Sequence, residues 1–83
     1  MTMLYSTQSG VKLYKLVPAD LVAEPFQLRH LNGKVLMNIQ AAGQWTTARL
    51  HALLNSQRVC DLVSEAFGAD AYVGTRCIGS TEA

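Results

Sequence analysis

The sequence predicts an α+β fold in which an antiparallel sheet packs against one long helix. Three observations support this prediction. Short runs of β-branched, aromatic and aliphatic residues alternate with turn-forming residues over the first 40 positions. A stretch without glycine or proline follows over residues 47–67, and a last apolar run covers residues 71–79. We therefore expect about five strands, arranged as two hairpins and a C-terminal strand.

Composition indicates one small globular domain that spans residues 1–83. The 83 residues are 49% hydrophobic and only 16% charged, which excludes a disordered chain. Seven basic and six acidic side chains are scattered and nearly cancel, so the totals show no electrostatic footprint for nucleic acid. No internal repeat or linker divides the chain.

The first hairpin is expected from residues 3–5 and 11–17. The turn formers of the sequence STQSG, residues 6–10, separate these two runs. The next segment, residues 18–25, begins and ends with proline. It is ambiguous between a short helical turn and an extended crossing.

The second hairpin is the clearest local signal. The pair Asn32-Gly33 favours a two-residue type I′ turn, in which both residues take a positive φ. This turn places Leu28 opposite Met37 and His30 opposite Val35. One face of the hairpin then carries Phe26, Leu28, His30, Val35, Met37 and Ile39.

The helix is expected to run over residues 47–67, from Thr47 to Phe67. Thr46 fits the N-cap position, and Trp45 and Leu50 have the spacing of a hydrophobic staple across it. Gly68 provides the stop. Beyond the helix, Gly74 interrupts the last strand and indicates a bulge or an edge.

The apolar residues of this helix do not share one face. At about 100° per residue, one side runs the whole length and is expected to lie on the sheet. That side consists of Ala48, Ala52, Val59, Leu62, Val63, Ala66 and Phe67. The three residues Leu50, Leu53 and Leu54 would then point away from the sheet. Each would lack the roughly 1.5 to 3 kcal/mol of stabilisation that burial of a leucine side chain contributes. We expect residues 18–25, a second copy of the chain or a different protein to cover them.

A competing interpretation breaks the helix at Asn55-Ser56, because both are weak helix formers and Ser56 could cap a second helix. Two helices joined by a tight turn invite comparison with DNA-reading motifs. The match is poor, because the turn lacks glycine. The second helix would also place Asp61 and Glu65 beside a single Arg58, and carboxylates oppose phosphate binding.

No catalytic, metal-binding or cofactor-binding motif is evident. The residues His30, His51, Cys60 and Cys77 are zinc-ligand types, but none is paired with another at the short spacing typical of structural zinc sites. No cysteine has an evident partner base, and the glycines form no phosphate loop. We expect a protein that is not an enzyme and that needs no metal or cofactor.

These observations favour a small protein that acts by protein–protein association, as a homodimer or as an adaptor or inhibitor of a larger partner. The expected contact residues are Trp45, Leu50, Leu53 and Leu54. The alternative is weak nucleic-acid binding through the hairpin tip and the helix, with Arg29, Lys34, Arg49 and Arg58 as the contacts.

The expected location is cytoplasmic. The N-terminus lacks the basic start and apolar block of a secretory signal, and no stretch is apolar enough to span a membrane. The two cysteines would then be reduced.

Overall fold

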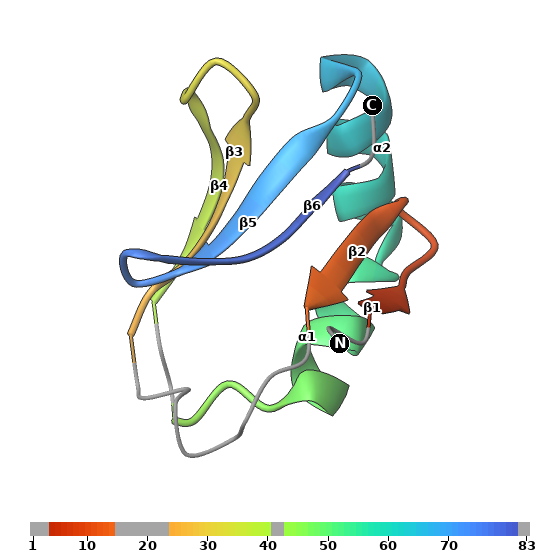
Figure 1. The fold of residues 1–83 in the computed structure, drawn as a ribbon. Helices are drawn as coiled ribbons and strands as arrows, with labels where there is room; N and C mark the ends of the chain where they lie inside the picture. The colour runs from red at the N-terminus through yellow and green to blue at the C-terminus, as the bar shows by residue number, and fades with distance from the viewer. Residues whose placement is uncertain (1–3, 15–23, 41–42, 82–83) are drawn as a thin grey trace.

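A computed structural model describes residues 4–14, 24–40 and 43–81. These residues form an antiparallel sheet and two helices (Figure 1). In chain order the elements are β1 (Leu4–Ser6), β2 (Val11–Tyr14), β3 (Phe26–His30), β4 (Val35–Ile39), α1 (Thr47–Leu54), α2 (Gln57–Ala66), β5 (Ala69–Val73) and β6 (Arg76–Thr81). The sheet has the strand order β1-β2-β6-β5-β3-β4. The α+β class and the antiparallel sheet are confirmed, but the single long helix is wrong.

The helical region breaks at Asn55 and Ser56, as the competing interpretation expected. Ser56 is extended at the N-cap of α2, although its side chain makes no capping hydrogen bond. The break is tied to the first hairpin, because the Oδ1 atom of Asn55 accepts a hydrogen bond of 2.7 Å from the backbone N–H of Gln8. Thr46 caps α1 as predicted, with its Oγ1 accepting from the N–H of Arg49 at 3.1 Å.

The break lets both helices present apolar residues to the core. On one straight helix Leu54 and Val59 would point about 140° apart. In the structure both are fully buried, together with Leu50. Burying two leucines stabilises the fold by roughly 1.5 to 3 kcal/mol each, more than the few hydrogen bonds of about 1 kcal/mol that the break interrupts. The predicted helix face is therefore wrong in part, since Ala48, Ala52 and Phe67 are exposed.

The first hairpin is confirmed. Strands β1 and β2 pair antiparallel, with Tyr5 opposite Leu13, and the N–H of Gly10 bonds the carbonyl of Thr7 at 3.0 Å in the turn. The rest of the predicted second strand, residues 15–17, and residues 18–23 of the following segment lie outside the described residues.

The second hairpin forms with a different turn. Gly33 has a φ of 97°, but Asn32 does not have a positive φ, so the turn is not type I′. The N–H of His30 bonds the carbonyl of Lys34 at 2.7 Å, which closes a three-residue loop. The predicted pairing holds from Phe26 to Leu28 and then shifts, placing Arg29 rather than His30 opposite Val35. The shift is a β-bulge, which a longer loop introduces.

The predicted C-terminal strand is itself a hairpin. Strands β5 and β6 pair antiparallel, and Val73 lies opposite Arg76 across the two-residue turn Gly74-Thr75. Gly74 has a φ of 61° and Thr75 does not have a positive φ, as in a type II′ turn. The glycine therefore reverses the chain instead of bulging one strand.

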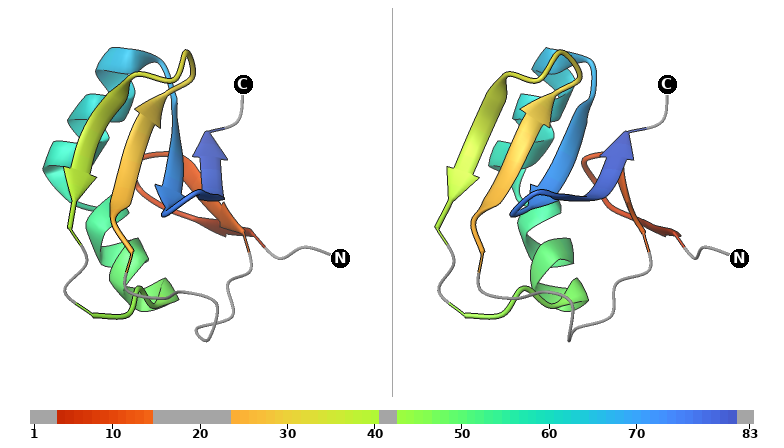
Figure 2. Two further views of the ribbon diagram at one scale, coloured as in Figure 1. Left: turned by 90° about the vertical axis from the view of Figure 1, so that its left-hand side faces the viewer. Right: turned by 60° about the vertical axis from the view of Figure 1, so that its left-hand side comes forward.

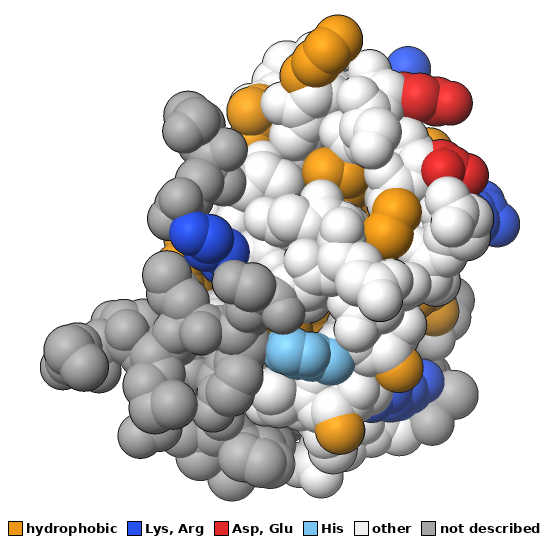
Figure 3. Space-filling model, turned by 90° about the vertical axis from the view of Figure 1, so that its right-hand side faces the viewer, with side chains coloured by type: hydrophobic (Ala, Val, Ile, Leu, Met, Phe, Trp, Pro, Cys, Tyr) orange, Lys and Arg blue, Asp and Glu red, His pale blue; other side chains and the backbone are white. Residues whose placement is uncertain are grey.

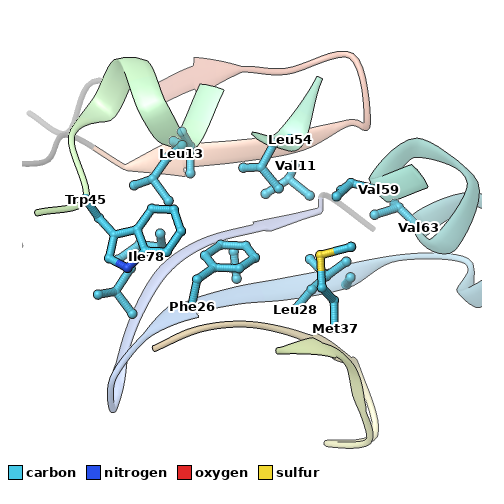
Figure 4. Packing of buried hydrophobic residues seen from close by; sticks show 14 residues of the cluster. Val11, Leu13, Phe26, Leu28, Met37, Trp45, Leu54, Val59, Val63 and Ile78 are labelled. Atoms are coloured by element: carbon cyan, nitrogen blue, oxygen red, sulfur yellow. The ribbon is translucent and has the colours of Figure 1, made fainter. Parts of the chain in front are cut away.

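The core lies between one face of the twisted sheet and the two helices (Figure 2). Alternate residues of the strands point into it, including Val11 and Leu13 of β2 and Phe26 and Leu28 of β3. Figure 4 shows these side chains meeting residues of both helices. Gly79 allows β2 to approach β6, because a Cβ atom there would lie 2.8 Å from the carbonyl oxygen of Lys12.

Candidate protein-interaction surface

The predicted contact residues lie in or against the core. Trp45 is 2% exposed, and Leu50 and Leu54 are fully buried. Figure 4 shows Trp45 and Leu54 among the side chains of the core. Leu53 is partly buried and packs against the same cluster. The expectation that these leucines point away from the sheet is wrong, because the break turns their side of α1 toward the sheet.

Trp45 joins the start of α1 to the sheet. Its Nε1–H donates a hydrogen bond of 2.7 Å to the carbonyl of Glu24, and its ring centroid lies 5.6 Å from that of Phe26. The guanidinium of Arg49 lies 3.9 Å from the centroid of the Trp45 ring. A buried indole with a satisfied N–H and two ring contacts is built to stabilise this corner of the fold.

Three large apolar residues are exposed among the described residues: Leu31 (54%), Val35 (46%) and Phe67 (92%). They lie at one end of the molecule, where the β3–β4 turn and the C-terminal end of α2 are found (Figures 1 and 2). A Cβ atom at Gly68, next to Phe67, would lie 3.2 Å from Cδ1 of Leu31, so Leu31 packs beside the α2–β5 junction. We call Leu31, Val35 and Phe67 the apolar end.

Phe67 combines exposure with an unusual backbone. It ends α2 in the left-handed conformation, with φ 55° and ψ 37°, and is the one described non-glycine residue with a positive φ. The next N–H, that of Gly68, bonds the carbonyl of Val63 at 3.0 Å, which is the pattern of a helix-ending motif that usually has glycine at the position of Phe67. A side chain there costs roughly 1 to 2 kcal/mol.

Sequence reasoning missed all three residues of the apolar end as a surface. It assigned Phe67 to the sheet-facing side of the helix and the stop to Gly68, one residue too late. A helix that is followed by glycine can end with either Phe67 or Gly68 in the left-handed conformation. The exposure of Phe67 depends on which one takes it.

The four cations of the nucleic-acid alternative are distributed over β3, the β3–β4 turn and the two helices. Arg29 lies flat on the sheet, with its guanidinium 4.3 Å from the centroid of the Tyr72 ring and its Nε and Nη2 donating to Oε1 of Gln27. Arg49 and Arg58 belong to the two helices, and Lys34 is exposed in the β3–β4 turn. The acidic Asp61 lies on α2 and accepts a hydrogen bond of 2.8 Å from Gln57.

The surface over α2 shows no concentrated patch of its own. Figure 3 views the molecule from the side on which this helix lies, and apolar side chains are scattered over it between polar and charged ones. Isolated apolar residues of this kind are ordinary on a protein surface. The apolar end differs because a nearly fully exposed aromatic residue is part of it.

The chemical groups considered for a reactive site remain dispersed. Within residues 4–14, 24–40 and 43–81, no group of three or more histidine, cysteine or acidic residues could hold a metal, and no pocket is found. Cys60 and Cys77 are free thiols. Partial burial of the Cys77 thiol raises its pKa above the ordinary 9.0, and the nearby Asp70 carboxylate acts in the same direction.

Neither described helix is long and apolar enough to cross a membrane. Comparison of the chain with protein-family models, with curated proteins and with solved structures found no match.

Proposed function

We propose that the protein acts by protein–protein association through the apolar end, with Phe67 as the anchor. The observation that carries the proposal is the 92% exposure of Phe67 in a left-handed backbone conformation. The exposed ring contributes little to the stability of the fold, and the left-handed backbone has a free-energy cost that glycine would avoid. Residues that carry such a cost are more often found at functional positions.

The neighbouring residues fit the same role. Aromatic residues dominate the energetics of protein interfaces, where they insert into the partner and are surrounded by apolar residues that exclude water. Leu31 packs beside the α2–β5 junction and Val35 begins the adjacent strand β4. Burying the phenyl ring of Phe67 alone would contribute roughly 1.5 to 3 kcal/mol to association.

The proposal keeps the association function expected from the sequence and moves it to other residues. The partner is a second copy of the chain or a larger protein for which this chain is an adaptor or inhibitor. We place the protein in the cytoplasm, where Cys60 and Cys77 would remain the free thiols that they are in the structure.

Three substitutions at one position test the proposal. Phe67→Gly removes the ring and relieves the backbone, Phe67→Ala removes the ring and keeps the backbone cost, and Phe67→Tyr keeps both. We expect Phe67→Gly to leave the free energy of unfolding unchanged or to raise it by up to about 1 kcal/mol. We expect both ring-deleting variants to weaken association at least ~10-fold, and Phe67→Tyr to retain it.

Association is measured in two ways. Sedimentation velocity over micromolar concentrations reports self-association of the purified chain. Proteins captured from the producing cell by the wild type are purified, and their dissociation constants are measured against all three variants. Equal binding by Phe67→Gly, or a loss of several kcal/mol of stability in that variant, would show that Phe67 is not an interaction anchor.

A further inference from the structure

The β3–β4 turn, which carries Leu31, is held by side chains that include a histidine. The backbone N–H of Asn32 donates to Nδ1 of His30 at 3.0 Å, and the N–H of Lys34 donates to Oδ1 of Asn32 at 3.0 Å. Two backbone bonds complete the turn, from Gly33 to the His30 carbonyl and from His30 to the Lys34 carbonyl, both at 2.7 Å. Leu31 lies between the histidine and the residue that donates to it.

We infer that protonation of His30 removes one of the hydrogen bonds that hold this turn and displaces Leu31 within the apolar end. Nδ1 accepts a hydrogen bond only while it carries no proton. A proton on Nδ1 would place an N–H donor against the N–H of Asn32 and remove the bond. Histidine is the side chain that ordinarily changes charge between pH 5 and 8.

The charges around His30 include both signs. Within the described part of the chain, Lys34 is the cation of the turn, and Arg29 precedes His30 on β3. Strand β4 carries no ionisable side chain, and β5, which pairs with β3, carries Asp70 opposite Arg29 and Tyr72 opposite Gln27. Helix α2, which leads into β5, carries Glu65 in its last turn. Lys34, in the same turn, would repel a protonated imidazole once the bond to Asn32 is lost.

The consequence for the surface follows from the position of Leu31. Its side chain packs at Gly68, next to Phe67, so a change in the turn alters the apolar end directly. This step rests on the proposed function, whereas the response of the turn does not. The structure thus combines an interaction surface with a pH-sensitive support.

Replacement of His30 by asparagine provides the matched test, because the Oδ1 atom of asparagine stands close to where Nδ1 stands and does not titrate. In the wild type we expect the protection of the Asn32 amide against hydrogen exchange, corrected for intrinsic rates, to fall roughly 2- to 10-fold between neutral and mildly acidic pH. The methyl resonances of Leu31 should shift over the same range. His30→Asn should show neither change, and His51→Asn should retain both.

A wild-type turn whose Asn32 protection and Leu31 methyl shifts do not change with pH would overturn the inference. So would a His30→Asn variant that still responds, because the titrating group would then lie elsewhere. These outcomes leave the proposed function standing. Loss of the proposed function would instead be seen as unchanged association in Phe67→Gly, whatever the turn does.

Discussion

Replacing Leu54 by alanine tests the revised role of the leucines most directly. The side chain of Leu54 is fully buried at the end of α1 and belongs to the cluster that fills the space between helices and sheet. Truncation removes the transfer free energy of the lost carbons and leaves a cavity that neighbours fill only in part. Such substitutions cost roughly 2 to 5 kcal/mol.

That cost is large for a chain of this size. An 83-residue domain has a free energy of unfolding on the order of 4 to 12 kcal/mol, so this single truncation removes a substantial share. The melting temperature should fall by roughly 4 to 8 °C for each kcal/mol lost. Leu31→Ala is the matched control, because the same atoms are removed from an exposed side chain, and its unfolding free energy should change by about 0.5 kcal/mol or less.

The assay is urea unfolding followed by the fluorescence of Trp45. Trp45 is the single tryptophan of the chain and is 2% exposed in the folded state, so its emission reports the loss of the core. The midpoint should fall in Leu54→Ala with little change in the slope. A loss of less than about 1 kcal/mol, together with a reduced solution mass, would show that the leucine contacts another chain and would refute the assignment to the core.

Two further predictions concern β6. Gly79→Ala should destabilise the fold by roughly 1 to 3 kcal/mol, because the new Cβ atom would press on the Lys12 carbonyl and on the side chains of Val11 and Leu13. Thermal unfolding checks this, and a neutral result would show that β2 yields without cost. Alkylation of Cys77 in a Cys60→Ser background should be slower in the folded than in the unfolded chain at pH 8, since the raised pKa leaves less thiolate. The raised pKa also means that the free energy of unfolding falls as pH rises above 9. A profile of the alkylation rate of Cys77 against pH with its midpoint below 9 would contradict both predictions.

The parts of the fold that the sequence predicted are those set by neighbouring residues. Turn formers mark the first hairpin, and the pairing of Leu28 with Met37 follows from alternation along the second. Thr46 caps α1 because a side-chain oxygen placed just before a helix satisfies a backbone N–H in any tertiary context.

The parts that the sequence did not predict depend on contacts between distant residues. Asn55 and Ser56 are weak helix formers but do not force a break. The break follows because it buries Leu50 and Leu54 and because Asn55 bonds Gln8 in a distant turn. In the same way, Asn32-Gly33 suits two kinds of hairpin loop, and the choice between them decides whether Val35 pairs with His30 or with Arg29.

The candidate site was missed for a related reason. Hydrophobic periodicity treats every aromatic residue near a helix end as a core residue, because burial is the usual fate of a phenyl ring. For Phe67 the end of α2 overrides that expectation: the residue takes the left-handed conformation and its ring points away from the core that Val59 and Val63 contact. A glycine at position 67 would end the helix equally well at lower cost. The fold therefore does not require phenylalanine there, which is why we propose Phe67 as the anchor of a contact with a partner.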